Sequence, residues 1–124
     1  MIRLLPLLAA LALAGCETEP MRKVQEILIP GQQALSTGLK QYEEGRYDQS
    51  LKNLQSAIEQ GLTERDRLTA HKYSAFIHCV SNRERQCRDE FRKALAVDPA
   101  LELTRAEAGH PVWGPIFRSL KTGK

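Results

Sequence analysis

The sequence predicts an all-α protein made of two helix–turn–helix units followed by C-terminal capping helices. Apolar residues recur at three- and four-residue steps from Gln32 onward, most densely between Tyr47 and Ile58. No segment in this part of the chain shows a convincing strand pattern. Glycines and prolines interrupt the helical pattern and divide it into paired segments, which favours helices joined by short turns.

The first sixteen residues have the pattern of a secretory signal. Arg3 precedes an uncharged run at 4–15, which is too short to cross a bilayer, since a spanning helix needs about 20 apolar residues. The run ends in "LAGC" at 13–16, which resembles the lipobox of bacterial lipoproteins and implies lipidation of Cys16. The alternative is an ordinary signal peptide with a chance cysteine. Glu17 stands where such lipoproteins carry an inner-membrane retention aspartate, so the resemblance implies the periplasmic side of the outer membrane.

The expected organisation is therefore a lipoprotein signal peptide at 1–15, a lipidated N-terminus and tether at 16–30, and one folded domain after it. Lys and Arg number 18 against 15 Asp and Glu, and the two signs are interspersed along the chain. This distribution is typical of a solvated surface. A nucleic-acid partner is not expected, whereas the lipid would bind the protein to a membrane.

Four helices are expected between Gln32 and the Asp98–Pro99 pair. Gly45 separates the first two, and Gly61 is suited to end the second. Thr63 is a candidate N-cap for the third helix, which should run to about Val80. The fourth helix carries the apolar residues Phe91, Ala94 and Leu95, and the proline should terminate it.

The spacing within these two units resembles the tetratricopeptide repeat, a helix pair of about 34 residues. The repeats would cover about 31–62 and 63–99, as a fragment of an α-solenoid, with 100–124 as a capping segment. Signature positions of the family hold Gly38, Gly45, Tyr47, Leu54 and Ala57 in the first unit, and Ala75, Phe91, Ala94 and Pro99 in the second. The second repeat is degenerate, because Asn82 replaces a turn glycine and Glu84 an aromatic residue. The alternative is a generic four-helix domain.

Cys79 and Cys87 lie equally far from Arg83, near the expected turn of the second unit. Residues equidistant from such a turn face each other across a helical hairpin, and an oxidising periplasm would let them form a disulfide. Free buried thiols, a metal site that adds His78, and a redox pair remain alternatives. The metal site lacks a second cysteine pair or a closely spaced histidine, and a redox catalyst more often carries Cys-x-x-Cys.

The C-terminal segment should contain two short helices. "TRAE" at 104–107 has the capping-box pattern, and the last helix is expected to start at Pro115. Trp113 and Phe117 are interpreted in two ways. They either pack onto the end of the second repeat as a cap, or form an exposed aromatic anchor for a partner.

No set of residues in the sequence resembles an active site or a metal centre, so the chain is expected to be non-enzymatic, with no cofactor beyond the lipid on Cys16. Tetratricopeptide repeats bind partners in a groove lined by the first helix of each pair. The resemblance therefore implies a groove that receives an extended peptide or a helix, built from Leu35, Leu39, Tyr42, Lys72, Tyr73 and Phe76. The alternative is that most of these six residues belong to the core, and Leu39 and Phe76 fit either position.

The blocks "AHKYSAFIHCVSNRERQCRDEFRKALAVDP" and "AEAGHPVWGP" also resemble small lipoproteins associated with type VI secretion systems. This resemblance implies an accessory adaptor that contacts the secretion apparatus. A pilotin-like or cell-wall-associated assembly lipoprotein is one alternative. Another is an envelope sensor in which Cys79 and Cys87 switch between thiol and disulfide.

Overall fold

A computed structural model describes residues 29–123 of the chain, and this part is entirely helical, without a strand. The order of the helices confirms the predicted all-α class: α2 (Gln32–Glu43), α3 (Tyr47–Gln60), α4 (Glu64–Val80), α5 (Glu84–Val97), α6 (Arg105–Ala108) and α7 (Trp113–Lys121). The signal peptide, Cys16 and most of the tether lie outside the described residues. Within the described residues, no helix has the length and apolar character needed to span a membrane.

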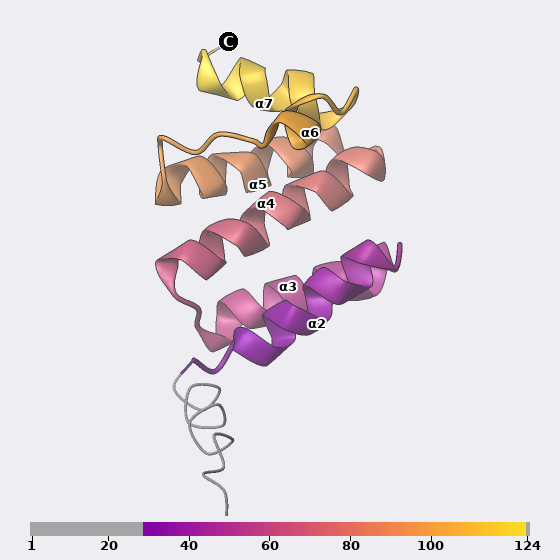
Figure 1. The fold of residues 1–124 in the computed structure, drawn as a ribbon, viewed down its shortest axis with the longest axis vertical. Helices are drawn as coiled ribbons and strands as arrows, with labels where there is room; N and C mark the ends of the chain where they lie inside the picture. The colour runs from indigo at the N-terminus through magenta and orange to yellow at the C-terminus, as the bar shows by residue number, and fades with distance from the viewer. Residues whose placement is uncertain (1–28, 124) are drawn as a thin grey trace, which may run out of the picture.

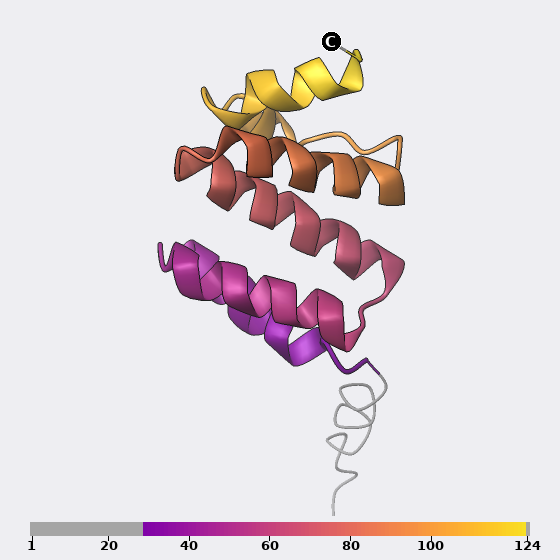
Figure 2. The same ribbon diagram turned by 180° about the vertical axis from the view of Figure 1, so that it is seen from behind.

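Two antiparallel helical hairpins, α2–α3 and α4–α5, lie one above the other, and the C-terminal helices cover the second hairpin (Figure 1). The helices α2, α4 and α6 face the viewer in Figure 1. Figure 2 shows the opposite face, on which α3 and α5 lie in front and α4 runs between them. The molecule therefore has an α2–α4–α6 face and an α3–α5 face.

The two hairpin turns have the same backbone geometry. Gly45 has φ of 76° and Asn82 has φ of 60°, so both adopt the left-handed conformation that the turn requires. In the first turn the amide of Arg46 donates to the carbonyl of Gln41 at 2.9 Å. In the second turn the amide of Arg83 donates to the carbonyl of His78, also at 2.9 Å. Asparagine tolerates positive φ better than most residues, which explains how the second turn forms without glycine.

Small residues bring the helices of the first hairpin close together. A Cβ atom on Gly38 would lie 3.0 Å from the side chain of Leu54, so glycine lets the two helices pack closely here. The buried hydroxyl of Ser50 donates to the Gly38 carbonyl at 2.6 Å. The buried polar group of Ser50 is therefore satisfied by a hydrogen bond rather than left unpaired.

The C-terminal segment is fixed by a set of local hydrogen bonds. Thr104 and Glu107 form the predicted capping box at the start of α6. The last helix starts at Trp113 and not at Pro115, so this prediction is wrong by two residues. The helix begins earlier because His110 Nδ1 accepts from the amides of Val112 and Trp113, at 3.1 and 3.4 Å, which satisfies two donors before the proline.

Candidate functional site

The α4–α5 hairpin brings Cys79 and Cys87 together as a disulfide, with their Cα atoms 5.1 Å apart. Both residues are buried in the core of the second hairpin. Reactive and redox-active cysteines sit in partly exposed surroundings, so this burial favours a structural role over a switch. No cluster of three or more metal-ligating side chains occurs among residues 29–123, and His78 binds Arg83 instead, with Arg83 Nε donating to His78 Nδ1 at 2.9 Å.

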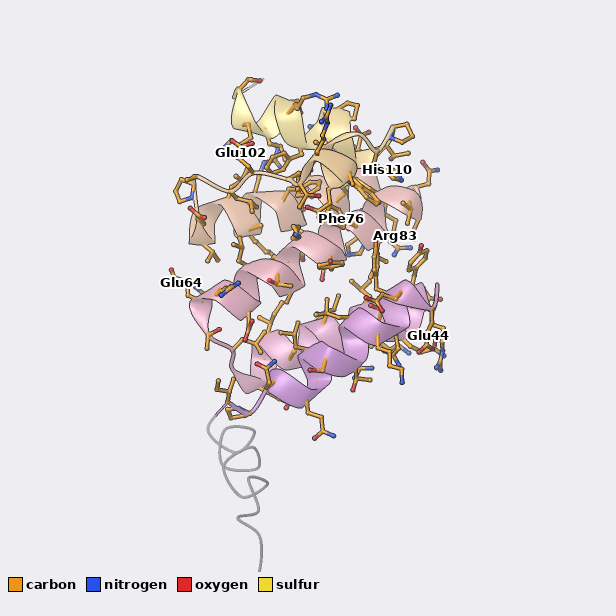
Figure 3. All side chains as sticks on the ribbon, viewed as in Figure 1. Glu44, Glu64, Phe76, Arg83, Glu102 and His110 are labelled. Atoms are coloured by element: carbon orange, nitrogen blue, oxygen red, sulfur yellow. A yellow bond between two sulfur atoms is a disulfide. The ribbon has the colours of Figure 1, made fainter. Side chains whose placement is uncertain are left out.

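Two of the six groove residues inferred from the repeat resemblance belong to the core, so their assignment to the groove is wrong. Leu35 is 2% exposed and packs with Leu54 and Ala57, and Phe76 is 1% exposed. Phe76 lies where α4 meets the C-terminal segment (Figure 3), and the indole of Trp113 stacks on it with ring centroids 4.2 Å apart. The capping segment therefore occupies the part of the groove that the second hairpin would have offered.

Lys72 is not a free cation in the groove, because an ion pair joins it to the C-terminal segment. Its ammonium lies 3.0 Å from Glu107 Oε2 and 5.2 Å from the ring centroid of Tyr73. Burial raises the pKa of Glu107, but hydrogen bonds from the Thr104 amide and from Lys72 outweigh it and hold that pKa below its ordinary value. Glu107 therefore caps α6 with one oxygen and ties α6 to α4 with the other.

Two of the predicted groove residues, Tyr42 from α2 and Tyr73 from α4, remain partly exposed. With Tyr47 from α3, which was not predicted for the groove, they form a cluster of three tyrosines that we call the tyrosine rim. The ring of Tyr42 meets Tyr73 edge to face at 4.9 Å and lies 5.6 Å from Tyr47. Burial, followed by the nearby phenols and Glu107, raises the pKa of Tyr42 to about 12. Its hydroxyl therefore stays protonated at neutral pH. Leu39 is half-buried and packs beside Tyr42 on the same helix.

Trp113 and Phe117 do not form an exposed aromatic anchor, so the sharper interpretation of the C-terminal segment is wrong and the capping interpretation is confirmed. Trp113 is 8% exposed and Phe117 3%. The indole lies between Phe76 and the ring of His110, whose centroid is 3.5 Å away, and Nε1 donates to the Glu107 carbonyl at 2.7 Å. These contacts use both ring faces and the polar atom of the tryptophan, which leaves little for a partner.

A second candidate site, which was not predicted from the sequence, lies on the α3–α5 face. A cleft of about 420 Å³ opens between α3 and α5, with α4 as its floor. Leu51 and Ile58 of α3 form one wall. His71 lies on the floor, where its Nδ1 is 2.7 Å from Glu90 Oε2 of α5. No local pattern in the sequence indicates this arrangement.

Comparisons with known proteins give no further assignment. Neither a protein-family model, nor a curated protein sequence, nor a solved structure matches the chain.

Proposed function

We propose that the chain is a non-enzymatic, lipid-anchored adaptor of the cell envelope that holds a protein partner at the tyrosine rim. The observation that carries this proposal is the rim itself, where side chains from three helices form one open aromatic cluster. Tyrosine is enriched at binding hot spots, because its ring buries a large apolar area while its hydroxyl keeps a hydrogen bond.

The rim suits an extended peptide or a helix laid across α2 and α4. Tyr42 and Tyr73 are half-buried and hold each other in place, so binding would cost little side-chain entropy. Leu39 extends the surface along α2 with an aliphatic side chain. In helix-in-groove recognition, a partner helix places apolar side chains, spaced about one turn apart, against such a surface.

The lipid anchor and the assignment to a secretion system are proposed from the sequence. The "LAGC" segment at 13–16 supports lipidation of Cys16 and a position on the periplasmic side of the outer membrane. The resemblance of the paired hairpins to tetratricopeptide repeats supports a scaffold role. The resemblance to small type VI secretion lipoproteins supports an accessory role in that apparatus.

Affinity capture of the lipidated protein from cells tests the proposal. Tyr73→Glu places a charge on the rim, whereas Gln86→Glu adds the same charge to an exposed position of α5 and serves as the control. We expect wild type and Gln86→Glu to capture secretion-apparatus components and Tyr73→Glu to lose them, with both variants folded by circular dichroism.

Two other results would change the assignment. Rim-dependent capture of a secretin or of cell-wall enzymes would support the pilotin-like or wall-associated alternative with the same binding surface. Equal capture by wild type and Tyr73→Glu would rule out the rim as the binding site.

A further inference from the structure

The cleft on the α3–α5 face contains a histidine whose second ring nitrogen has no partner. His71 is only 9% exposed, and its Nδ1 lies 2.7 Å from Glu90 Oε2. Among the described residues, no side-chain polar atom that is shielded from solvent lacks a hydrogen bond. His71 Nε2 has no such bond, so it must reach open space, and the open space that His71 lines is the cleft.

Glu90 keeps the ring hydrogen of His71 on Nδ1. Burial raises the pKa of Glu90, but the hydrogen bond and charge of His71, together with Lys93, outweigh it and hold that pKa below its ordinary value. The carboxylate is therefore ionised at neutral pH and only accepts, so Nδ1 must donate in this bond. In the neutral ring, Nε2 then has a lone pair and no hydrogen, which makes it an acceptor for a ligand that donates.

The charges around the cleft also favour a cationic ligand. The carboxylates of Glu59 and Glu90 line it together with the ammonium of Lys93, so these three charges sum to minus one. Lys93 pairs with Glu90 at 3.2 Å, whereas no ion pair within the described part of the chain uses Glu59. His78 adds no positive charge, because burial and the Arg83 charge lower its pKa and keep the ring neutral at pH 7.

Leu51 and Ile58 give the cleft an apolar wall beside these polar groups. They lie seven residues apart on α3, about 10 Å along the helix axis, so the wall is long enough for a pentyl chain. Both residues are half-buried, and each keeps part of its apolar surface open. The cleft volume of about 420 Å³ lies within the range of about 300–1,000 Å³ that small-molecule sites occupy.

We propose that this cleft binds a primary ammonium group carried on an unbranched apolar chain. The ammonium donates to Nε2 of His71 beside the negative charge of Glu59, and the chain lies against Leu51 and Ile58. The ligand is either a small free amine or a lysine side chain of a partner protein, because both present the same groups. The cleft shares no residue with the tyrosine rim, so this binding does not depend on the function proposed above.

Histidine side-chain ¹⁵N spectra of the whole chain, titrated with pentylammonium chloride at pH 8.5, test the proposal directly. This pH lies above the usual range of histidine titration, whereas an alkylammonium keeps its charge. We expect a saturable change at Nε2 of His71 and none at His110, which lies outside the cleft. Pentanol lacks the charge and pentyltrimethylammonium lacks the N–H donors, so neither should reproduce this change.

Glu59→Gln gives the proposal a directional test, because it removes a negative charge from the cleft and keeps a side chain of similar size. It should weaken the binding of pentylammonium by about twofold, the effect of one exposed charge pair. Glu64→Gln removes an exposed charge from the start of α4, outside the cleft, and is the matched control. It should leave the binding of pentylammonium unchanged.

An N-terminally acetylated peptide with a single lysine between alanines distinguishes the two sources. Tighter binding of this peptide than of pentylammonium, lost when the lysine is acetylated, would identify a protein side chain. Pentylammonium binding that the peptide does not exceed would identify a small amine. The proposal is overturned if pentylammonium leaves Nε2 of His71 unchanged, if pentanol or pentyltrimethylammonium acts equally, or if Glu59→Gln binds pentylammonium as tightly as Glu64→Gln.

Discussion

Replacing Trp113 with alanine should strongly destabilise the protein, because this side chain joins the C-terminal segment to the second hairpin. The indole stacks on Phe76 at 4.2 Å and on His110 at 3.5 Å, and it donates a hydrogen bond to the Glu107 carbonyl. Truncation leaves a cavity against Phe76 and removes one of the two hydrogen bonds to the Glu107 carbonyl, which keeps the bond from the His110 amide.

The size of the effect follows from the burial. Replacing a buried Phe or Trp with alanine costs about 3–5 kcal/mol, against a total stability of about 5–15 kcal/mol for a typical domain. One kcal/mol shifts the melting temperature of a domain of this size by about 4–8 °C. We therefore expect Trp113→Ala to lower the melting temperature by about 12 °C or more.

Val112→Ala is the control, because Val112 is adjacent in sequence and 43% exposed. A substitution at such a surface position costs about 0.5 kcal/mol or less. Thermal unfolding followed by far-ultraviolet circular dichroism measures both variants. Equal shifts for the two variants would refute the buried position of the indole and return Trp113 to the role of an exposed anchor.

Three further predictions concern the stability of the same fold. Replacing Cys79 and Cys87 with alanine should lower the free energy of unfolding by about 2–3 kcal/mol in the chain-entropy model, since the two cysteines are eight residues apart. Urea titration measures this change, and an unchanged midpoint would contradict the disulfide. Gly31→Ala should lower the free energy of unfolding by about 1–3 kcal/mol, because the new Cβ would collide with backbone carbonyls at the end of α3. Gly109→Ala has room for the Cβ and should be near neutral in the same titration. The lowered pKa of Glu107 stabilises the folded protein fully above pH 4.5, the ordinary pKa of this group, and this stability is lost as the pH falls through the lower folded-state pKa. The urea midpoints at pH 7 and pH 3 should therefore differ less in Glu107→Gln than in wild type. An equal difference would contradict this linkage.

Local features of the sequence were sufficient to predict the helices and the position of the disulfide. The three- and four-residue spacing of apolar side chains in α3 and α5 depends only on neighbouring residues, and so do the caps at Thr63 and Thr104. Cys79 and Cys87 could be paired because their equal distance from Arg83 determines how they face each other across a short turn.

The groove could be predicted only in part, because its covering comes from a distant segment. Lys72 and Phe76 have the positions of groove residues in α4, but Glu107 and Trp113 fold back onto them. No local pattern indicates that a capping-box glutamate also forms an ion pair with a lysine of α4. The family resemblance favoured an open groove, and for Phe76 the alternative position in the core is the correct one.

The cleft on the α3–α5 face depends on contacts that periodicity does not reveal. His71 and Glu90 lie on different helices, and their bond depends on how α4 packs against α5. A histidine on the inner side of a helix is usually a core residue. Its unpartnered nitrogen is visible only once the surrounding helices are in place.

Site-specific photocrosslinking in intact cells tests the central claim, that a partner binds at the tyrosine rim. A photoreactive phenylalanine derivative at position 73 reports on the rim, and the same derivative at the exposed position 86 of α5, outside the rim, is the control. The account predicts a crosslink from position 73 to one envelope protein and none to that protein from position 86. Crosslinks to the same protein from position 86 and none from position 73 would contradict it.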